Sequence, residues 1–439
     1  MEKINKFFGL TVLGLSIAVL PFCTGKEIRP QDDNVLYWNL RSPLTIRLDG
    51  NFNNGNSNYS AIIKDGDIEI ELSNVALVFN NTNLVISVFF SNDNVPQLSE
   101  TFNLHIKSEQ RLRDIARFQV VQRHSFPHIA VITKTPSIHR GGSGVVVFEA
   151  RDEVLDSVIV RDNHGNRFFP VPMAREGYYM CMVGWHVGFD KFDAYIIAKD
   201  RAGNASTNRI DFEKTDKSYP VRRLQVQPTF AQEKAEELGV TDLPDDEQEK
   251  YQAVTRAMAQ TRRVSIYEIT SRPVEGIFKE VEFLSFDPLK NHRVTSGFGL
   301  LRRYMYQGKQ VRQSYHLGID LASTLQAPLV VGNDGTVIFA GYNGGFGNTI
   351  VVDHGLGIYS LYSHCTTLNF KEGDLVKRGD VIATTGTTGY ATGDHVHFSI
   401  IINGVYVDPS DWMDDTWISS NIIEVIERAS RIIMLYPET

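Results

Sequence analysis

Short runs of β-branched and aromatic residues, separated by Asn, Asp and Gly, recur along most of this 439-residue chain. Many of these runs alternate apolar and polar positions, as Ile68–Leu72 does, or are rich in β-formers, as Ile358–His364 is. A period of two buries one face of a strand, whereas an amphipathic helix needs an apolar period near 3.6. The sequence therefore predicts a mostly β protein, and its length allows about three domains.

Two regions of this kind occupy the first half of the chain. Residues 27–125 and 127–214 each have the strand and turn pattern of a β-sandwich-like domain. In the second region, Asp200–Asn204 resembles the hairpin turn of immunoglobulin-like modules, with Gly203 and Asn204 able to take a positive φ. This second region is therefore expected to be an immunoglobulin-like β-domain.

The pattern changes period between residues 228 and 263. Pro228 begins a short helical pattern that ends at Gly239, and a second helix is expected from 242 to 263. We expect this segment to be a helical linker. Residues 284–415 return to strands separated by glycine-bearing turns, typical of an antiparallel β-sheet enzyme, and 416–439 predict a C-terminal helical tail.

The N-terminus has the features of a targeting segment. Lys3 and Lys6 precede the apolar stretch Phe7–Leu20, and small residues follow, so residues 1–23 are expected to be a secretory signal peptide. The apolar stretch is short for a membrane span, although a single N-terminal anchor is the alternative. Cys23 stands where a bacterial lipoprotein carries its lipid, but Phe22 is bulkier than the residue usual before it. The expected location is the bacterial cell envelope, periplasmic or secreted, with membrane contact only through the signal or a lipid anchor.

The charge and the cysteine content argue against a nucleic-acid-binding protein and against a disulfide-rich scaffold. Asp and Glu outnumber Lys and Arg by 52 to 44, which argues against nucleic acid as a partner. Three cysteines cannot form a disulfide scaffold, and Cys181 is expected to be a buried free thiol.

The chemistry is expected in the region 284–415, which holds a group of histidines. His395 and His397 are two apart on a predicted strand, so both side chains leave one face. His364 is in register with Ile358, Ser360 and Tyr362 and is expected to share their face.

His316 and Asp320 are four residues apart, which is about 13 Å in an extended chain, so the two can converge only if the chain bends. Gly318 could supply that bend. Two histidines and one carboxylate with an open fourth position are the ligand set of a catalytic zinc ion. Spacing alone does not distinguish His395 from His397 as the ligand.

Other conspicuous residues have simpler interpretations. Cys365 adjoins His364, but neighbours on a strand point to opposite faces, which argues against a cysteine nucleophile. His354 is expected to make hydrogen bonds at a turn. The glycine-rich stretches 341–347 and 386–393 lack the Gly-Lys-Ser/Thr ending of a phosphate loop and are expected to be tight turns.

Taken in order, these residues resemble a known family. The resemblance extends from Val294 to Pro409 and is carried by motifs that contain all five candidate positions. The motifs are Val294–Gly299, His316–Asp320, Asp334–Ile338, Gly347–His354, Leu361–His364, Gly373–Val376, Gly379–Asp380, Gly386–Gly389, Thr392–Phe398 and Val407–Pro409. They are similar to those of the lysostaphin-like, LytM-type zinc metallopeptidases, which cleave peptide bridges in bacterial peptidoglycan.

The resemblance implies roles for these residues. It implies one zinc ion per catalytic domain, with His316, Asp320 and His397 as ligands, and it makes His364 and His395 the catalytic pair. Two positions depart from the family pattern. Asp394 stands where a proline usually precedes His-x-His, and Ser399 stands where an acidic residue is common.

Two functions are therefore expected as alternatives. The first is a zinc-dependent endopeptidase that hydrolyses peptide cross-links of peptidoglycan, with the N-terminal β-domains available to envelope protein partners. The second is a non-catalytic regulator that binds and activates a peptidoglycan amidase, because some relatives have lost metal ligands. The intact set of five residues favours the enzyme.

Overall fold

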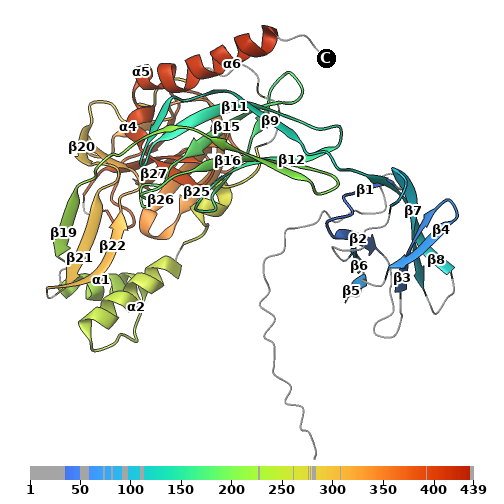
Figure 1. Cartoon of the computed structure of the whole chain (residues 1–439). Helices are drawn as coiled ribbons and strands as arrows, with labels where there is room; N and C mark the ends of the chain where they lie inside the picture. The colour runs from blue at the N-terminus through green and yellow to red at the C-terminus, as the bar shows by residue number, and fades with distance from the viewer. Residues whose placement is uncertain are drawn as a thin grey trace, which may run out of the picture. The chain divides into compact units, whose positions relative to one another are not determined.

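The computed structural model describes residues 35–49, 59–72, 75–80, 83–90, 97–108, 113–225, 228–260, 262–274, 276, 278, 283–306, 308–391 and 393–435. The predicted signal peptide and Cys23 lie outside these residues. The chain is mostly β, as predicted, and forms two compact units (Figure 1). The first comprises residues 1–125 and 201–204, and the second comprises 126–200 and 205–439. No helix in the described residues is long and apolar enough to cross a membrane.

The first unit is built from two sheets around one apolar core. Its strands are β1 (Val35–Trp38), β2 (Leu44–Asp49), β3 (Tyr59–Asp65), β4 (Ile68–Leu72), β5 (Val75–Asn80), β6 (Asn83–Val88), β7 (Thr101–Ser108) and β8 (Arg113–Gln122). The five-stranded sheet has the order β1-β8-β7-β3-β4 and the three-stranded sheet β2-β6-β5. Trp38 and Ile63 from the first sheet and Ile46 from the second are buried in the shared core. This packing of alternate apolar residues from two sheets is that of a β-sandwich.

The second unit begins with another pair of sheets. Its strands are β9 (His128–Lys134), β10 (Ser137–His139), β11 (Ser143–Arg151), β12 (Leu155–Asp162), β13 (Arg167–Phe168), β14 (Val171–Pro172), β15 (Tyr178–Gly184), β16 (Ala194–Asp200), β17 (Ala205–Ile210) and β18 (Glu213–Thr215). They form the four-stranded sheets β14-β15-β11-β9 and β13-β12-β16-β17, with β10 paired to β18. The predicted Asp200–Asn204 turn joins β16 to β17. Gly203 has a φ of 89°, whereas Asn204 does not adopt a positive φ.

A helical segment follows β19 (Val221–Gln225), as the change of period predicts. Helix α1 (Pro228–Leu238) packs on α2 (Glu247–Gln260) through small apolar residues that include Ala231, Ala235 and Val254. Helix α2 is shorter at both ends than the predicted 242–263. A third helix, α3 (Ile266–Thr270), was not predicted from the sequence; it has five residues and is capped by Ser265.

The candidate site lies in the largest sheet of the second unit. The strands of this region are β20 (Arg293–Ser296), β21 (Leu301–Tyr306), β22 (Lys309–Tyr315), β23 (Ile319–Ala322), β24 (Pro328–Val330), β25 (Gly335–Tyr342), β26 (Asn348–Asp353), β27 (Ile358–Cys365), β28 (Leu375–Val376), β29 (Val381–Thr384), β30 (Val396–Ile402) and β31 (Val405–Val407), with a short 3-10 turn η1 (Gly344–Phe346). The eight-stranded sheet has the order β20-β23-β30-β27-β26-β25-β28, and β31 also pairs with β30. Every pairing in this sheet is antiparallel.

Both faces of this sheet are covered. Phe398 and Ile400 face the main core of the second unit, whereas Ile401 packs with Leu361 and with Ile266 of α3. His397 alternates with Phe398 and so shares the face of Ile401. The histidine-bearing face of β30 therefore continues, away from the site, into a small apolar cluster.

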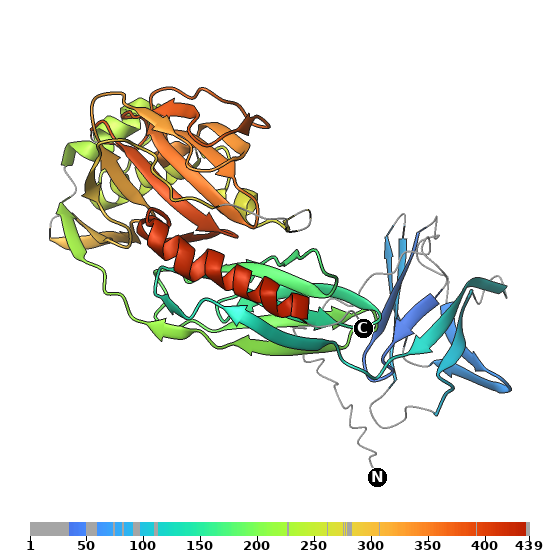
Figure 2. The same cartoon turned by 90° about the horizontal axis from the view of Figure 1, so that it is seen from above.

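The C-terminal segment is helical and returns to the second sandwich. It contains α4 (Pro409–Trp412), α5 (Asp415–Ile418), the π turn η2 (Ser419–Ile423) and α6 (Glu424–Leu435). Figure 2 shows α6, in red, lying along the strands of that sandwich. Thr133 Oγ1 on β9 donates to the Val425 carbonyl at 3.0 Å, and Trp412 Nε1 donates to Ser143 Oγ at 3.0 Å. These contacts, together with a continuous apolar core, join the sandwich and the large sheet into one unit.

Candidate metal and catalytic site

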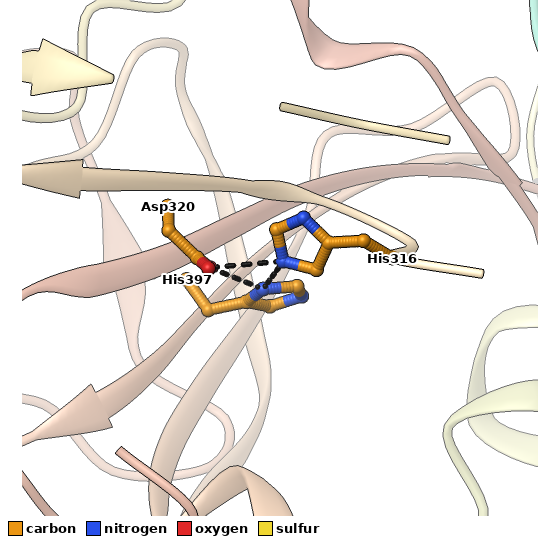
Figure 3. Close-up of side chains that lie close together, drawn as sticks. All are labelled: His316, Asp320 and His397. Atoms are coloured by element: carbon orange, nitrogen blue, oxygen red, sulfur yellow. Dashed lines mark hydrogen bonds and ion pairs between the residues drawn. The ribbon is translucent and has the colours of Figure 1, made fainter. Parts of the chain in front are cut away.

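Three side chains from different segments meet at one end of the large sheet. His316 follows β22, Asp320 lies in β23 and His397 lies in β30. His316 Nε2 is 2.9 Å from Asp320 Oδ1 and 2.9 Å from His397 Nδ1, and the last two atoms are 3.0 Å apart (Figure 3). A tetrahedral ion with bonds of ~2.0 Å places its ligands roughly 3.3 Å apart. The three atoms could therefore hold a metal ion after shifts of a few tenths of an ångström.

Strand pairing and one glycine bring these side chains together. Asp320 pairs directly with His397 across β23 and β30, so both side chains project from the same face. His316 reaches them because the chain bends before β23 and crosses close to β30. A Cβ atom at Gly318 would lie 2.5 Å from the Phe398 carbonyl oxygen and 2.6 Å from the His397 ring. The absence of a side chain at Gly318 is what permits this crossing.

Hydrogen bonds fix the orientation of both histidine rings. His316 Nδ1 donates to the Gly297 carbonyl at 2.8 Å, which leaves Nε2 facing Asp320. His397 is oriented the other way, with Nδ1 facing Asp320 and Nε2 3.1 Å from Ser399 Oγ. When Nδ1 of His397 is unprotonated, Nε2 donates to Ser399. Such partners hold a metal-binding imidazole in one tautomer. Ser399, a departure from the family pattern, thus fills this supporting position with a neutral hydroxyl.

A second pair of histidines lies beside this group. The rings of His364 and His395 are 4.9 Å apart, and His395 Nε2 is 3.8 Å from Asp320 Oδ1. His364 Nδ1 is 2.8 Å from the Thr388 carbonyl, and His395 Nδ1 is 2.7 Å from the Gly393 carbonyl. Because a carbonyl can only accept, Nδ1 of each neutral ring carries the proton and Nε2 keeps a lone pair. Both rings can therefore accept a proton at Nε2.

The prediction that His364 shares the face of Tyr362 is wrong. Tyr362 pairs with Phe398 across β27 and β30, on the face opposite His397. The pairing of β27 with β26 shifts by one residue near Cys365, and His364 adopts a left-handed φ of 65°. A bulge of this kind redirects a side chain. It places the His364 ring 6.1 Å from the His397 ring, on the side of the site.

Burial sets the charges of these groups. It lowers the pKa of His364 to about 3 and that of His397 to about 4. Burial alone would raise the pKa of Asp320, but its close contacts with His316 and His397 hold that pKa well below its usual range. At neutral pH the site therefore holds an ionised carboxylate with neutral rings at His364 and His397. A cation requires its ligands in these protonation states.

The sequence gives no signal for several supporting groups. The carbonyls of Gly297, Thr388 and Gly393 orient the histidines, but a backbone carbonyl is common to every residue type. Arg302, on the β21–β22 hairpin, donates through Nη2 to Asp320 Oδ2 at 3.2 Å and to Ser296 Oγ at 3.0 Å. This contact was not predicted from the sequence.

The residues set aside in the sequence analysis have structural roles. Burial raises the pKa of the Cys365 thiol to about 12, so this residue is unsuited to be a nucleophile. His354 bonds the Asp334 carbonyl at 2.8 Å and Ser360 Oγ at 2.7 Å, which confirms the predicted turn contacts. Asp394, the other departure from the family pattern, accepts a 2.5 Å hydrogen bond from Thr385.

The antiparallel sheet thus carries a His-Asp-His group that could hold a metal ion, with two further histidines beside it. Residues 314–409 match Peptidase family M23, so the C-terminal part of the chain carries an M23 domain. The predicted resemblance is thereby confirmed for this region.

Several known proteins are similar to part of this chain. The DD-carboxypeptidase/endopeptidase Mpg of Neisseria meningitidis is 33% identical over 135 residues, which are 30% of each chain. The peptidoglycan DD-endopeptidase ShyB of Vibrio cholerae is 36% identical over 116 residues, or 26% of each chain. The crystallised catalytic domain of lysostaphin from Staphylococcus simulans is 29% identical, with a TM-score of 0.24, covering 28% of this chain and 92% of that one. The match thus spans less than a third of the length of Mpg and of ShyB.

Proposed function

We propose that this protein is a zinc-dependent endopeptidase that hydrolyses peptide cross-links of bacterial peptidoglycan. The observation that carries the proposal is the convergence of His316, Asp320 and His397, with the rings of His364 and His395 beside them. Relatives named as peptidoglycan DD-endopeptidases, ShyB and ShyC of Vibrio cholerae, support the substrate class. We assign the first three residues as zinc ligands and the other two as catalytic residues.

The chemistry that zinc supplies when bound is Lewis acidity, which polarises a carbonyl and acidifies water. The chain's own histidines supply the proton transfers. In the neutral form of His364 or His395 the Nδ1 proton is directed at a carbonyl, so Nε2 of that ring can take a proton from the attacking water. A ring protonated in this way can stabilise the developing oxyanion and then pass its proton to the leaving amine. The Thr388 and Gly393 carbonyls keep both rings oriented during this exchange.

The proposal includes the site of action. Residues 1–23 have the pattern of a secretory signal, and peptidoglycan lies outside the cytoplasm. We therefore propose that the mature protein acts in the cell envelope, periplasmic or secreted, with Cys23 as a candidate lipid anchor. Its β-domains are candidates for contact with envelope protein partners.

The test is mass spectrometry of peptides released from purified bacterial sacculi by the chain from residue 24 onward, with and without a zinc chelator. We expect cross-link cleavage that the chelator stops and added zinc restores. His395→Ala should abolish release, whereas His128→Ala, at an exposed histidine of the second unit, should not. A folded, zinc-loaded protein that releases nothing would refute the enzyme and favour the non-catalytic regulator.

A further inference from the structure

The small sheet beside the candidate site has an unusual charge composition. Strands β19, β21 and β22 form a three-stranded sheet of order β19-β21-β22. The six charged residues on these strands are all basic, in a chain that has an excess of eight acidic residues overall. They are Arg222, Arg223, Arg302, Arg303, Lys309 and Arg312. Strand β19 precedes the helical segment and lies outside the residues that match the peptidase family.

Strand register places two of these arginines on the face of the site. Arg222 on β19 pairs directly with Arg302 on β21, so the two side chains project from the same face. Arg302 reaches Asp320, which shows that this face is turned toward the candidate metal ligands. Arg223 is the next residue on β19 and therefore projects from the opposite face.

Neither arginine has its donors satisfied by the protein. Arg302 forms its two hydrogen bonds through Nη2 alone, and Arg222 is exposed. Among the described residues, no carboxylate forms an ion pair with Arg222. Like charges directly opposite one another on neighbouring strands destabilise a sheet. An anion bound between the two guanidinium groups would offset that repulsion.

We propose that Arg222 and Arg302 together bind a carboxylate of the peptide substrate and so make the enzyme selective for acidic peptides over their amidated forms. A guanidinium group matches a carboxylate with paired N–H donors, and charge-assisted hydrogen bonds of this kind are strong. The position beside Asp320 places the bound carboxylate near the scissile bond. The inference rests on the proposed function, since it names the substrate that the same site selects.

The test compares two synthetic cross-linked peptides that differ only in a free carboxylate or a carboxamide next to the cleaved bond. The wild-type protein should show a lower KM for the free carboxylate. Arg222→Ala should raise the KM for that peptide on the order of tenfold, with kcat little changed, and leave the amidated peptide unaffected. Arg222→Glu should raise it further. Arg223→Ala and Arg223→Glu are the matched controls, because they change the same charge on the opposite face.

Equal effects of the Arg222 and Arg223 variants would overturn the proposal, since they would indicate only a general attraction to basic charge. Equal loss on both peptides would also overturn it. If the wild-type protein cleaves neither peptide, the proposed function fails separately, and calorimetric binding of the two peptides to wild type and Arg222→Ala still tests the arginine pair. Inorganic phosphate that competes as well as acetate would show a site for any anion and refute carboxylate selectivity.

Discussion

Gly318 offers a direct test of how the chain assembles its candidate metal ligands. An added Cβ would lie 2.5 Å from the Phe398 carbonyl oxygen, a distance below the 3.0 Å that real Cβ contacts keep. In the Gly318→Ala variant, the segment that crosses β30 must therefore move away from it by about 0.5 Å even to reach that limit. Strand pairing between Ile319 and Phe398 opposes this movement. Metal–ligand bond lengths vary by only about 0.2 Å, and strand pairing limits how far these side chains can follow a moved backbone. His316 should then no longer meet Asp320 and His397 in a common site.

We expect Gly318→Ala to weaken zinc binding at least ~10-fold and to destabilise the fold by roughly 1–3 kcal/mol. Competition with a chromophoric chelator measures the affinity, and urea unfolding of the zinc-free protein measures the stability. Gly297→Ala is the control, because no atom lies within 4 Å of a Cβ added there and its carbonyl still accepts from His316. Wild-type zinc affinity in Gly318→Ala would refute the argument that close passage over β30 builds the site.

Three further predictions test other parts of the structure. His395→Ala should abolish peptide release yet retain zinc measured by atomic absorption, whereas His397→Ala should lose both; loss of zinc in His395→Ala would contradict the division of roles. The low pKa of His364, about 3, lies below that of an unfolded histidine, ~6.5, so the unfolded chain binds more protons as the pH falls between these values. The zinc-free protein should lose stability over this range in urea titrations, and His364→Asn should flatten the dependence; an unchanged slope would show that His364 is not buried in its neutral form. Trp412→Ala should cost about 3–5 kcal/mol, because Trp412 is fully buried and donates to Ser143; a small loss in calorimetry would show that this contact does not couple the sandwich to the large sheet.

Local rules account for the part of the site that the sequence predicts. His395 and His397 lie on one face, opposite Phe398, because alternation along a strand depends only on neighbouring residues. The bend between His316 and Asp320 was also predicted at Gly318. The sequence suggested Gly318 because glycine allows a bend. In the structure, glycine is needed because the chain passes close to β30, about 80 residues further along the sequence. A contact between distant segments leaves no local pattern in either one.

The groups that orient the site residues could not be predicted from the sequence, because they too depend on contacts between distant segments. Hydrogen bonds to the carbonyls of Thr388 and Gly393 depend on where two loops pass, not on which side chains they carry. The contact of Arg302 with Asp320 depends on the hairpin that carries it. Family motifs locate the five candidate residues in the sequence. Which ring nitrogen of each histidine carries the proton depends on the positions of backbone carbonyls in three dimensions.

The side chain of His364 does not follow the alternation expected along a strand, and the cause can be tested by measuring stability. A non-glycine residue at φ 65° costs about 1–2 kcal/mol, and neighbouring interactions must hold it there. His364→Gly and His364→Ala remove the same imidazole, but only glycine adopts this φ without strain. At an ordinary strand position Ala is the more stable of the two by about 0.5–1 kcal/mol. Here the order should reverse, with His364→Gly more stable than His364→Ala by about 1 kcal/mol in urea unfolding and both variants inactive. If His364→Ala were the more stable variant, the strand would run regularly at this position, and the bulge could not be what turns the imidazole toward the site.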